Sequence, residues 1–308
     1  MNSPGGKKGT VPICAKHPSG RSGKWGLSPF SLGYNTNGLA HHDLLDAVEL
    51  LARIGYRSVA VTIDHGALSP RDAVWRQQLA ALRRRLDELG MRSVIETGAR
   101  FLLDPAAKHE PTLVTADPAA RARRLEFYRH AVRCAAELQS DCVSLWSGVV
   151  DDAAPQEAVM SRLVDGLEQV LEYGKQHQVT IGLEPEPGMF IDRLARFDEL
   201  LGRLRGPGLM LTLDVGHAHC QGETPIAEQI DRWAGRLVNV HVEDMRSGVH
   251  EHLMFGEGQI DFLPVLAALV RSGYQGGLHV ELSRHSHDAP RAARQAYAFL
   301  APLLAARP

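Results

Sequence analysis

The sequence has few cysteines, no long apolar run and almost no net charge. Its 308 residues include 4 cysteines, and no two of them form a C-x-x-C pair, so a disulfide framework is not expected. The longest apolar stretches, such as residues 262–270, hold about nine residues, whereas a membrane-spanning helix needs ~20. Because 34 basic side chains face 36 acidic ones, the net charge of −2 disfavours binding to nucleic acid, which requires a basic surface.

The N-terminal segment does not show the pattern of a secretory signal, and we expect none. Its first 26 residues mix glycine, serine, proline and lysine and contain no apolar core of the kind found in secretory signals. We expect residues 1–26 to form a flexible tail and residues 27–308 to form one domain of a cytoplasmic protein. We expect no membrane partner.

What the sequence does contain is a regular alternation of apolar runs and helical patterns. The apolar runs lie at residues 30–35, 58–64, 92–97, 142–146, 179–184, 209–214, 237–243 and 277–282. The helical patterns lie at residues 43–54, 73–89, 119–138, 156–177, 197–204, 226–233, 262–272 and 290–305. Strands that are apolar throughout and joined by helices indicate a parallel sheet covered on both faces. Eight such units in about 280 residues predict a single (β/α)8 TIM barrel. A doubly wound open sheet is the alternative, but the glycine-rich phosphate loop typical of it is missing.

Polar side chains gather at the carboxyl ends of these predicted strands. Barrel enzymes carry their chemistry at that end. The positions there are Tyr34, Asn35, Asp64, His65, Glu96, Trp146, Glu184, Glu186, Asp214, His217, His241, Glu243, Asp244, Glu281, His285 and His287. The opposite ends, which include Val179 and Leu237, carry no comparable set. We therefore predict an active-site mouth at the carboxyl ends.

Four of these residues follow the last four strands in order: Glu184, Asp214, His241 and Glu281. Burying three neighbouring carboxylates is very costly because desolvation and mutual repulsion add. A divalent cation would offset both costs. Three oxygen ligands and one imidazole suit Mn²⁺ best, with Mg²⁺, Co²⁺ or Zn²⁺ as alternatives. Ion pairs with Arg or Lys are the other reading, and the scarcity of basic residues at strand ends disfavours it.

Histidine is in surplus: there are 15 in the chain, and many of them lie between Asp214 and His287. We interpret His217, on the loop after the sixth strand, as a substrate contact, with a capping or packing histidine as the alternative. The other candidates for substrate binding are His65, Glu96, Trp146, Arg246, His250 and His252. We interpret Gly256 and Gly258 as a tight turn rather than a phosphate cradle, and Glu186 as a solvent-facing loop acid.

Five motifs in the second half of the chain occur in a recognisable order. They are L-E-P at Leu183–Pro185, L-D-V-G-H at Leu213–His217, N-V-H-V-E-D at Asn239–Asp244, F-G-E-G-Q-I-D-F at Phe255–Phe262 and H-V-E-L at His279–Leu282. Together they resemble the sugar phosphate isomerase/epimerase superfamily, which has a xylose-isomerase-like TIM barrel. The resemblance covers strands five to eight closely and the first four by architecture only.

The resemblance implies a single divalent metal held by Glu184, Asp214, His241 and Glu281. It also implies that Glu184 and Glu281 carry the proton as the catalytic pair and that His217 binds substrate. Members that epimerise ketoses have an arginine shortly after the metal histidine, a place near Arg246, and a glutamate where this sequence has Phe190.

The expected reaction is abstraction of a proton next to a carbonyl in a keto-sugar, polyol or cyclitol, through an enediolate, as in an isomerase or epimerase. One alternative is a lyase that dehydrates an inosose or keto-sugar. Another is an apurinic-endonuclease-like phosphodiesterase, which the charge disfavours, and a third is a non-catalytic binding barrel. A homo-oligomer is compatible with the sequence, and no nucleic-acid partner is expected.

Overall fold

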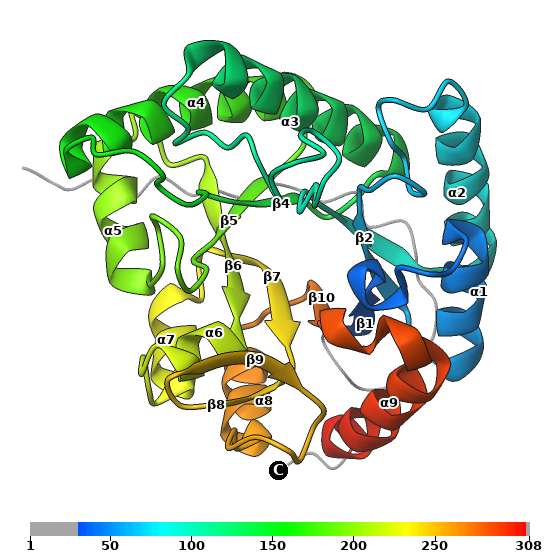
Figure 1. Ribbon diagram of the computed structural model, residues 1–308. Coiled ribbons are helices and arrows are strands. Elements are labelled where there is room, and N and C mark those ends of the chain that lie inside the picture. The colour runs from blue at the N-terminus through cyan, green and yellow to red at the C-terminus, as the bar shows by residue number, and fades with distance from the viewer. Residues whose placement is uncertain (1–29, 306–308) are drawn as a thin grey trace, which may run out of the picture.

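The computed structural model describes residues 30–305, and eight parallel strands in it close into a barrel (Figure 1). Around the barrel the order is β1-β10-β7-β6-β5-β4-β3-β2. The strands are β1 (Ser31–Asn35), β2 (Ser58–Thr62), β3 (Arg92–Glu96), β4 (Val143–Trp146), β5 (Ile181–Glu184), β6 (Leu209–Asp214), β7 (Leu237–Val242) and β10 (Gly277–Val280). The predicted TIM barrel is therefore confirmed.

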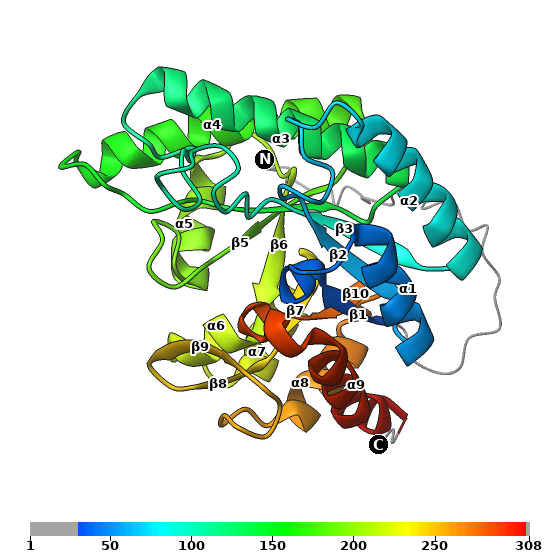
Figure 2. The same ribbon diagram turned by 45° about the vertical axis from the view of Figure 1, so that its right-hand side comes forward.

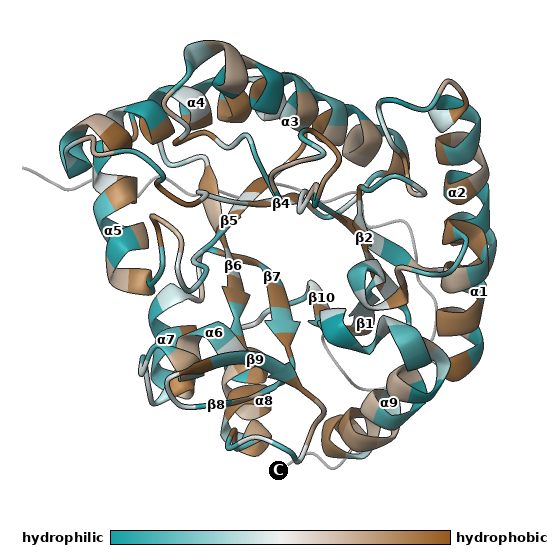
Figure 3. Ribbon diagram, viewed as in Figure 1, coloured by the Kyte–Doolittle hydropathy of each residue, from teal (hydrophilic) through white to brown (hydrophobic). Residues whose placement is uncertain are grey.

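Helices form the outer ring of the barrel. They are α1 (Leu44–Ile54), α2 (Trp75–Leu89), α3 (Pro118–Leu138), α4 (Gln156–Gln176), α5 (Leu194–Arg203), α7 (Ile226–Trp233), α8 (Phe262–Arg271) and α9 (Ala289–Ala305). Local chemistry sets their ends: the Asp43 and Asp117 carboxylates cap α1 and α3, and Gly90 ends α2 in a left-handed conformation. Figure 3 shows apolar and polar stretches alternating along these helices, as expected where one helix face packs on strands.

The inside of the barrel holds a buried polar chain. His279 lies there with no exposed surface, between Ser58 and Asn239. Room for its ring comes from two glycines, since a Cβ on Gly33 or Gly277 would lie 2.4 Å or 2.1 Å from a ring carbon of His279. Only glycine therefore fits at these two strand positions without displacing the imidazole.

The segments after four of the strands are more ordered than the sequence indicated. The segment after β7 forms an antiparallel hairpin of β8 (Asp244–Arg246) and β9 (Val249–Leu253), which turns at Gly248 with φ +73°. A short helix, α6 (Val215–Cys220), follows β6, and 3-10 turns follow β1 (η1, Thr36–Leu39) and β10 (η2, Ser283–Asp288). In Figure 2, α6 and the hairpin lie side by side.

The expected tail over residues 1–26 lies outside the described residues. Among the helices that the structure describes, none is long and apolar enough to cross a bilayer.

Candidate active site

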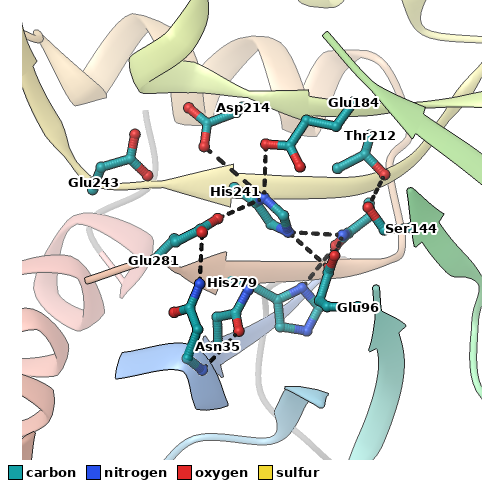
Figure 4. A network of polar contacts seen from close by, with 12 residues as sticks. Asn35, Glu96, Ser144, Glu184, Thr212, Asp214, His241, Glu243, His279 and Glu281 are labelled. Carbon is teal, nitrogen blue, oxygen red and sulfur yellow. Dashed lines mark hydrogen bonds and ion pairs between the residues drawn. The ribbon is translucent and has the colours of Figure 1, made fainter. Parts of the chain in front are cut away.

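The four candidate metal ligands meet at the carboxyl end of the barrel (Figure 4). Glu184 and Asp214 end β5 and β6, His241 lies in β7 opposite Asp214, and Glu281 directly follows β10. One ligand atom from each lies within 4.8 Å of the others. The Nδ1 atom of His241 is 2.9 Å from Glu281 Oε2, 3.3 Å from Glu184 Oε1 and 3.9 Å from Asp214 Oδ2. A single imidazole nitrogen therefore faces three carboxylates.

The chemistry of this cluster fits a divalent cation. Asp214 Oδ2 is buried and has no hydrogen-bond partner, which is costly for a charged oxygen. Burial alone would raise the pKa of Glu184, but His241 and His217 outweigh it and hold that pKa at about 2. Burial would also raise the pKa of Glu281, but His241 outweighs this effect and holds that pKa below its usual range. Both glutamates are therefore ionised and available as hard oxygen ligands.

Glu96, a candidate for substrate binding, lies beneath His241 and faces that residue. Its Oε1 atom accepts hydrogen bonds from His241 Nε2 (2.9 Å) and from Asn239 Nδ2 (2.9 Å). A carboxylate bound to the far nitrogen of a ligating histidine fixes its tautomer and ring orientation. This placement favours an orienting role for Glu96, with His241 Nδ1 presented to the other carboxylates.

His217 lies on helix α6 rather than on a loop, and its ring forms part of the cluster wall. Its backbone N–H donates to Asp214 Oδ1 (2.7 Å), so Asp214 also caps this helix. The Nδ1 atom of His217 is 3.3 Å from Glu184 Oε1. On the other side of the ring, Nε2 is 3.1 Å from His250 Nε2. The short helix therefore brings His217 into contact with both the candidate ligands and the hairpin.

A buried aspartate on β8 holds the turn that follows the hairpin. The carboxylate of Asp244 accepts four backbone N–H groups, from Met245 (2.9 Å), Gly256 (2.9 Å), Gly258 (2.9 Å) and Ile260 (3.1 Å). These amide groups are thereby satisfied by the protein. Gly256 and Gly258 lie in a turn around the Asp244 carboxylate, in line with the turn expected from the sequence. Their amide groups bind this carboxylate and are not available to bind a phosphate.

The other candidates for substrate binding are Trp146, His65 and Arg246. Trp146 ends β4, in register with Glu184 of β5. Trp146, which is 8% exposed, packs with its ring 4.7 Å from the guanidinium of Arg124. His65 is exposed after β2, and exposed Arg246 donates to the carbonyl of Glu257 (3.2 Å). Within the described chain, no hydrogen bond or ion pair links His65 or Arg246 to the four ligands. Their substrate role stays a prediction.

The remaining candidate on the hairpin, His252, lies beside a ligand. Its Nδ1 atom donates to the backbone carbonyl of Glu281 (3.1 Å), and 8% of its surface is exposed.

Three residues near the cluster were not assigned a role in it from the sequence. Asn37 Nδ2 donates to Glu281 Oε1 (2.7 Å), and nothing in the sequence marks this amide. Glu186, interpreted as solvent-facing, instead points at Glu184 and His217, and burial together with neighbouring carboxylates raises its pKa to about 8. Glu243 is fully buried with both carboxylate oxygens lacking a hydrogen-bond partner. The signal that could have found Glu186 is its E-P-E spacing from Glu184.

Comparisons with known proteins agree with the fold. The model of the xylose isomerase-like TIM barrel family matches residues 48–303. L-ribulose-5-phosphate 3-epimerase UlaE of Escherichia coli is 26% identical over 251 residues, covering 80% of this chain and 85% of that protein. The Shigella flexneri UlaE is 28% identical over 254 residues, with the same two coverages.

Solved structures share the fold. A D-tagatose 3-epimerase-like protein superposes with a TM-score of 0.74 at 20% identity, covering 90% of this chain and 97% of that one. An L-ribulose 3-epimerase gives a TM-score of 0.72 at 21% identity, covering 90% and 95%. The IolI protein with a bound zinc atom gives 0.70 at 17% identity, covering 90% and 98%. Because the family model spans most of the chain, this protein belongs to the xylose isomerase-like TIM barrel family.

Proposed function

We propose that this protein is a divalent-metal-dependent epimerase or isomerase of a keto-sugar, polyol or cyclitol. The observation that carries the proposal is the convergence of Glu184, Asp214, His241 and Glu281 within 4.8 Å, with a glutamate on either side of one imidazole nitrogen. The names of the relatives support it, since UlaE is an epimerase of L-ribulose 5-phosphate.

These four residues would hold the cation. Their oxygen-rich set favours Mn²⁺, with Mg²⁺, Co²⁺ and Zn²⁺ as alternatives. When bound, the ion would supply Lewis-acid stabilisation of the negative charge that develops on the substrate oxygens in an enediolate.

The protein's own residues move the proton. One of Glu184 and Glu281 accepts the proton from the carbon next to the carbonyl, and the other returns a proton. Return to the same carbon gives an epimer, and return to its neighbour gives an isomer. Glu184 is 4% exposed, so proton transfer would occur largely shielded from bulk water.

Two neighbours would keep the glutamates in place. Asn37 Nδ2 donates to Glu281 Oε1, which restrains that carboxylate while leaving Oε2 directed toward the cluster. His217, beside Glu184, would contact substrate hydroxyl groups. A restrained carboxylate loses less freedom on reaching the transition state.

The test is exchange of a carbon-bound proton with solvent. Purified protein loaded with Mn²⁺ is incubated in D₂O with a panel of ketoses, L-ribulose 5-phosphate and inososes, and deuterium incorporation is followed by NMR. We expect incorporation next to the carbonyl of at least one substrate. Glu281→Gln should reduce its rate by about 10²-fold or more, because loss of an acid–base group costs this much.

The matched control is Glu88→Gln, which makes the same chemical change at a side chain that is 60% exposed on α2. This variant should exchange at the wild-type rate. Undiminished exchange in folded Glu281→Gln, or no exchange with any member of the panel, contradicts the proposal.

A further inference from the structure

A buried arginine at the rim of the barrel lies against Trp146, the predicted substrate contact. Arg124 belongs to α3, in the outer ring of helices, and none of its surface is exposed. Its Nη2 atom donates to the backbone carbonyl of Thr97 (3.1 Å), the residue that follows β3. The side chain therefore reaches from the outer helix to the carboxyl ends of the strands, where the candidate active site lies.

Aromatic rings surround the charge of Arg124 in place of a carboxylate. Among the described residues, its buried Nε and Nη1 atoms have no hydrogen-bond partner. The guanidinium carbon lies 4.7 Å from the ring centroids of Trp146 and Tyr128 and 5.3 Å from that of Phe127. Contacts between a cation and aromatic rings strengthen when they are desolvated. An apolar side chain would fill this space without the cost of a buried unpaired charge, so the guanidinium itself calls for a role.

The same helix holds Trp146 on the inner face of the barrel. Trp146 ends β4 in register with Glu184 of β5, so the two side chains leave the sheet on the same side. Tyr128, one turn after Arg124 on α3, donates its hydroxyl to the backbone carbonyl of Trp146 (3.4 Å). Tyr128 thus restrains the backbone of this residue, and Arg124 restrains its ring.

A second fixed group contacts the Trp146 ring. His109, on the loop between β3 and α3, lies edge to face with it, with ring centroids 5.3 Å apart and planes at 82°. His109 Nδ1 donates to the carbonyl of Gly98 (2.6 Å). Burial lowers the pKa of His109 to about 4, so its ring is neutral and adds no positive charge beside Arg124. Both neighbours of the indole are therefore tied to the backbone directly after β3.

We propose that Arg124 is a positioning residue, which fixes the Trp146 indole as a rigid wall beside Glu184 for the carbon skeleton of the substrate. This inference rests on the proposed function. A wall that is already immobile loses little freedom when a sugar binds, so the arrangement raises affinity. Because the wall contacts the substrate and not the transferred proton, its loss weakens ground-state and transition-state binding alike.

The first test measures motion of the Trp146 ring in the full chain. The ¹⁵N–¹H heteronuclear NOE of the indole groups is recorded, and the Trp146 signal is identified by its loss in Trp146→Phe. This indole should be as rigid as the backbone in wild-type protein and mobile in Arg124→Met, which keeps much of the volume but not the charge. Arg124→Lys keeps the charge but not the planar group, and it should loosen the ring as well.

The matched control is Arg129→Met on the same helix. The guanidinium of Arg129 lies 5.8 Å from the ring centroid of Tyr173, and its side chain is 36% exposed. This variant should leave the Trp146 signal and the exchange kinetics unchanged. A Trp146 ring that stays rigid in both folded Arg124 variants overturns the proposal.

The second test asks whether Arg124 acts through Trp146. KM and kcat are measured for deuterium exchange into the panel member that exchanges fastest. Arg124→Met and Trp146→Ala should each raise KM about 2–10-fold with kcat nearly unchanged, as expected for loss of an aromatic contact. Because the two residues act as a unit, the double variant should raise KM no further than Trp146→Ala alone. Additive effects on KM, or a fall in kcat at constant KM, contradict the positioning role.

The two tests separate this role from the proposed function. A loosened Trp146 ring in a protein that exchanges no member of the panel supports the fixing of the ring by Arg124 and refutes the proposed function. Exchange at the wild-type KM in both folded Arg124 variants supports the proposed function and overturns the positioning role.

Discussion

The carboxylate of Asp244 offers a stringent test of how the mouth is held together. It is 2% exposed, and each of its oxygens accepts two backbone N–H groups: Met245 and Ile260 on Oδ1, Gly256 and Gly258 on Oδ2. In Asp244→Asn, one oxygen becomes an NH₂ group, so two amides lose their acceptor whichever way the side chain turns. A hydrogen bond to a charged group contributes about 1.5–3 kcal/mol, so the free energy of unfolding should fall by about 3–6 kcal/mol.

The assay is urea unfolding followed by circular dichroism, with the free energy of unfolding extrapolated to water. Such a loss is a large share of the 5–15 kcal/mol that is typical of native proteins. The matched control is Asp261→Asn at the start of α8, where the side chain accepts only the N–H of Leu263 (3.2 Å). Asn caps helices about as well as Asp, so this variant should be nearly neutral. A loss below about 1 kcal/mol in Asp244→Asn would refute the assigned role of the carboxylate.

Two further predictions concern buried polar groups. Glu96→Gln removes the charge that faces His241 Nε2. The dissociation constant for Mn²⁺, measured by calorimetry, should therefore rise about 10–100-fold. An unchanged dissociation constant would contradict the orienting role of Glu96. Burial lowers the pKa of His109 to about 4, so the folded state resists protonation of this ring and stability should fall as the pH drops from about 6.5 toward 4. His109→Gln should flatten that part of the stability profile, and an unchanged slope argues against a buried neutral ring.

The barrel itself could be predicted because its evidence is local. Each strand is apolar for most of its length and each helix has its own periodic pattern, so neighbouring residues were enough to place them. The candidate ligands also lie at predictable positions, since the carboxyl ends of parallel strands always share one end of a barrel.

Contacts that depend on closure of the barrel could not be predicted. Glu96 and His241 are 145 positions apart and come from β3 and β7, which are not neighbours in the sheet. The sequence placed Glu96 at a strand end but carried no information on what lay across the barrel. The hairpin was missed for a similar reason, because the Asp244 carboxylate that organises it reaches 16 positions along the chain to Ile260.

The polar chain inside the barrel explains why His241 directs its Nδ1 atom toward the carboxylates. Asn239 Oδ1 accepts from His279 Nδ1 (2.8 Å), so the amide's Nδ2 is directed at Glu96 (2.9 Å). His279 Nε2 is then an acceptor for the hydroxyl of Ser58 (2.8 Å), and burial holds the pKa of His279 well below its usual range, which keeps it neutral.

The chain ends at Glu96 Oε1, which accepts the Nε2 proton of His241, and Asn239 Nδ2 also lies 3.0 Å from that nitrogen. The Nδ1 atom then lies 2.9 Å from Glu281 Oε2 and 3.3 Å from Glu184 Oε1. Burial opposes a positive charge on His241, but Glu184, Glu96 and Glu281 outweigh it and raise the pKa of this ring well above its usual range, so a proton occupies Nδ1 when no metal ion is bound. A metal ion would have to displace this proton, and the four side chains best placed to bind one are those at the ends of β5, β6, β7 and β10.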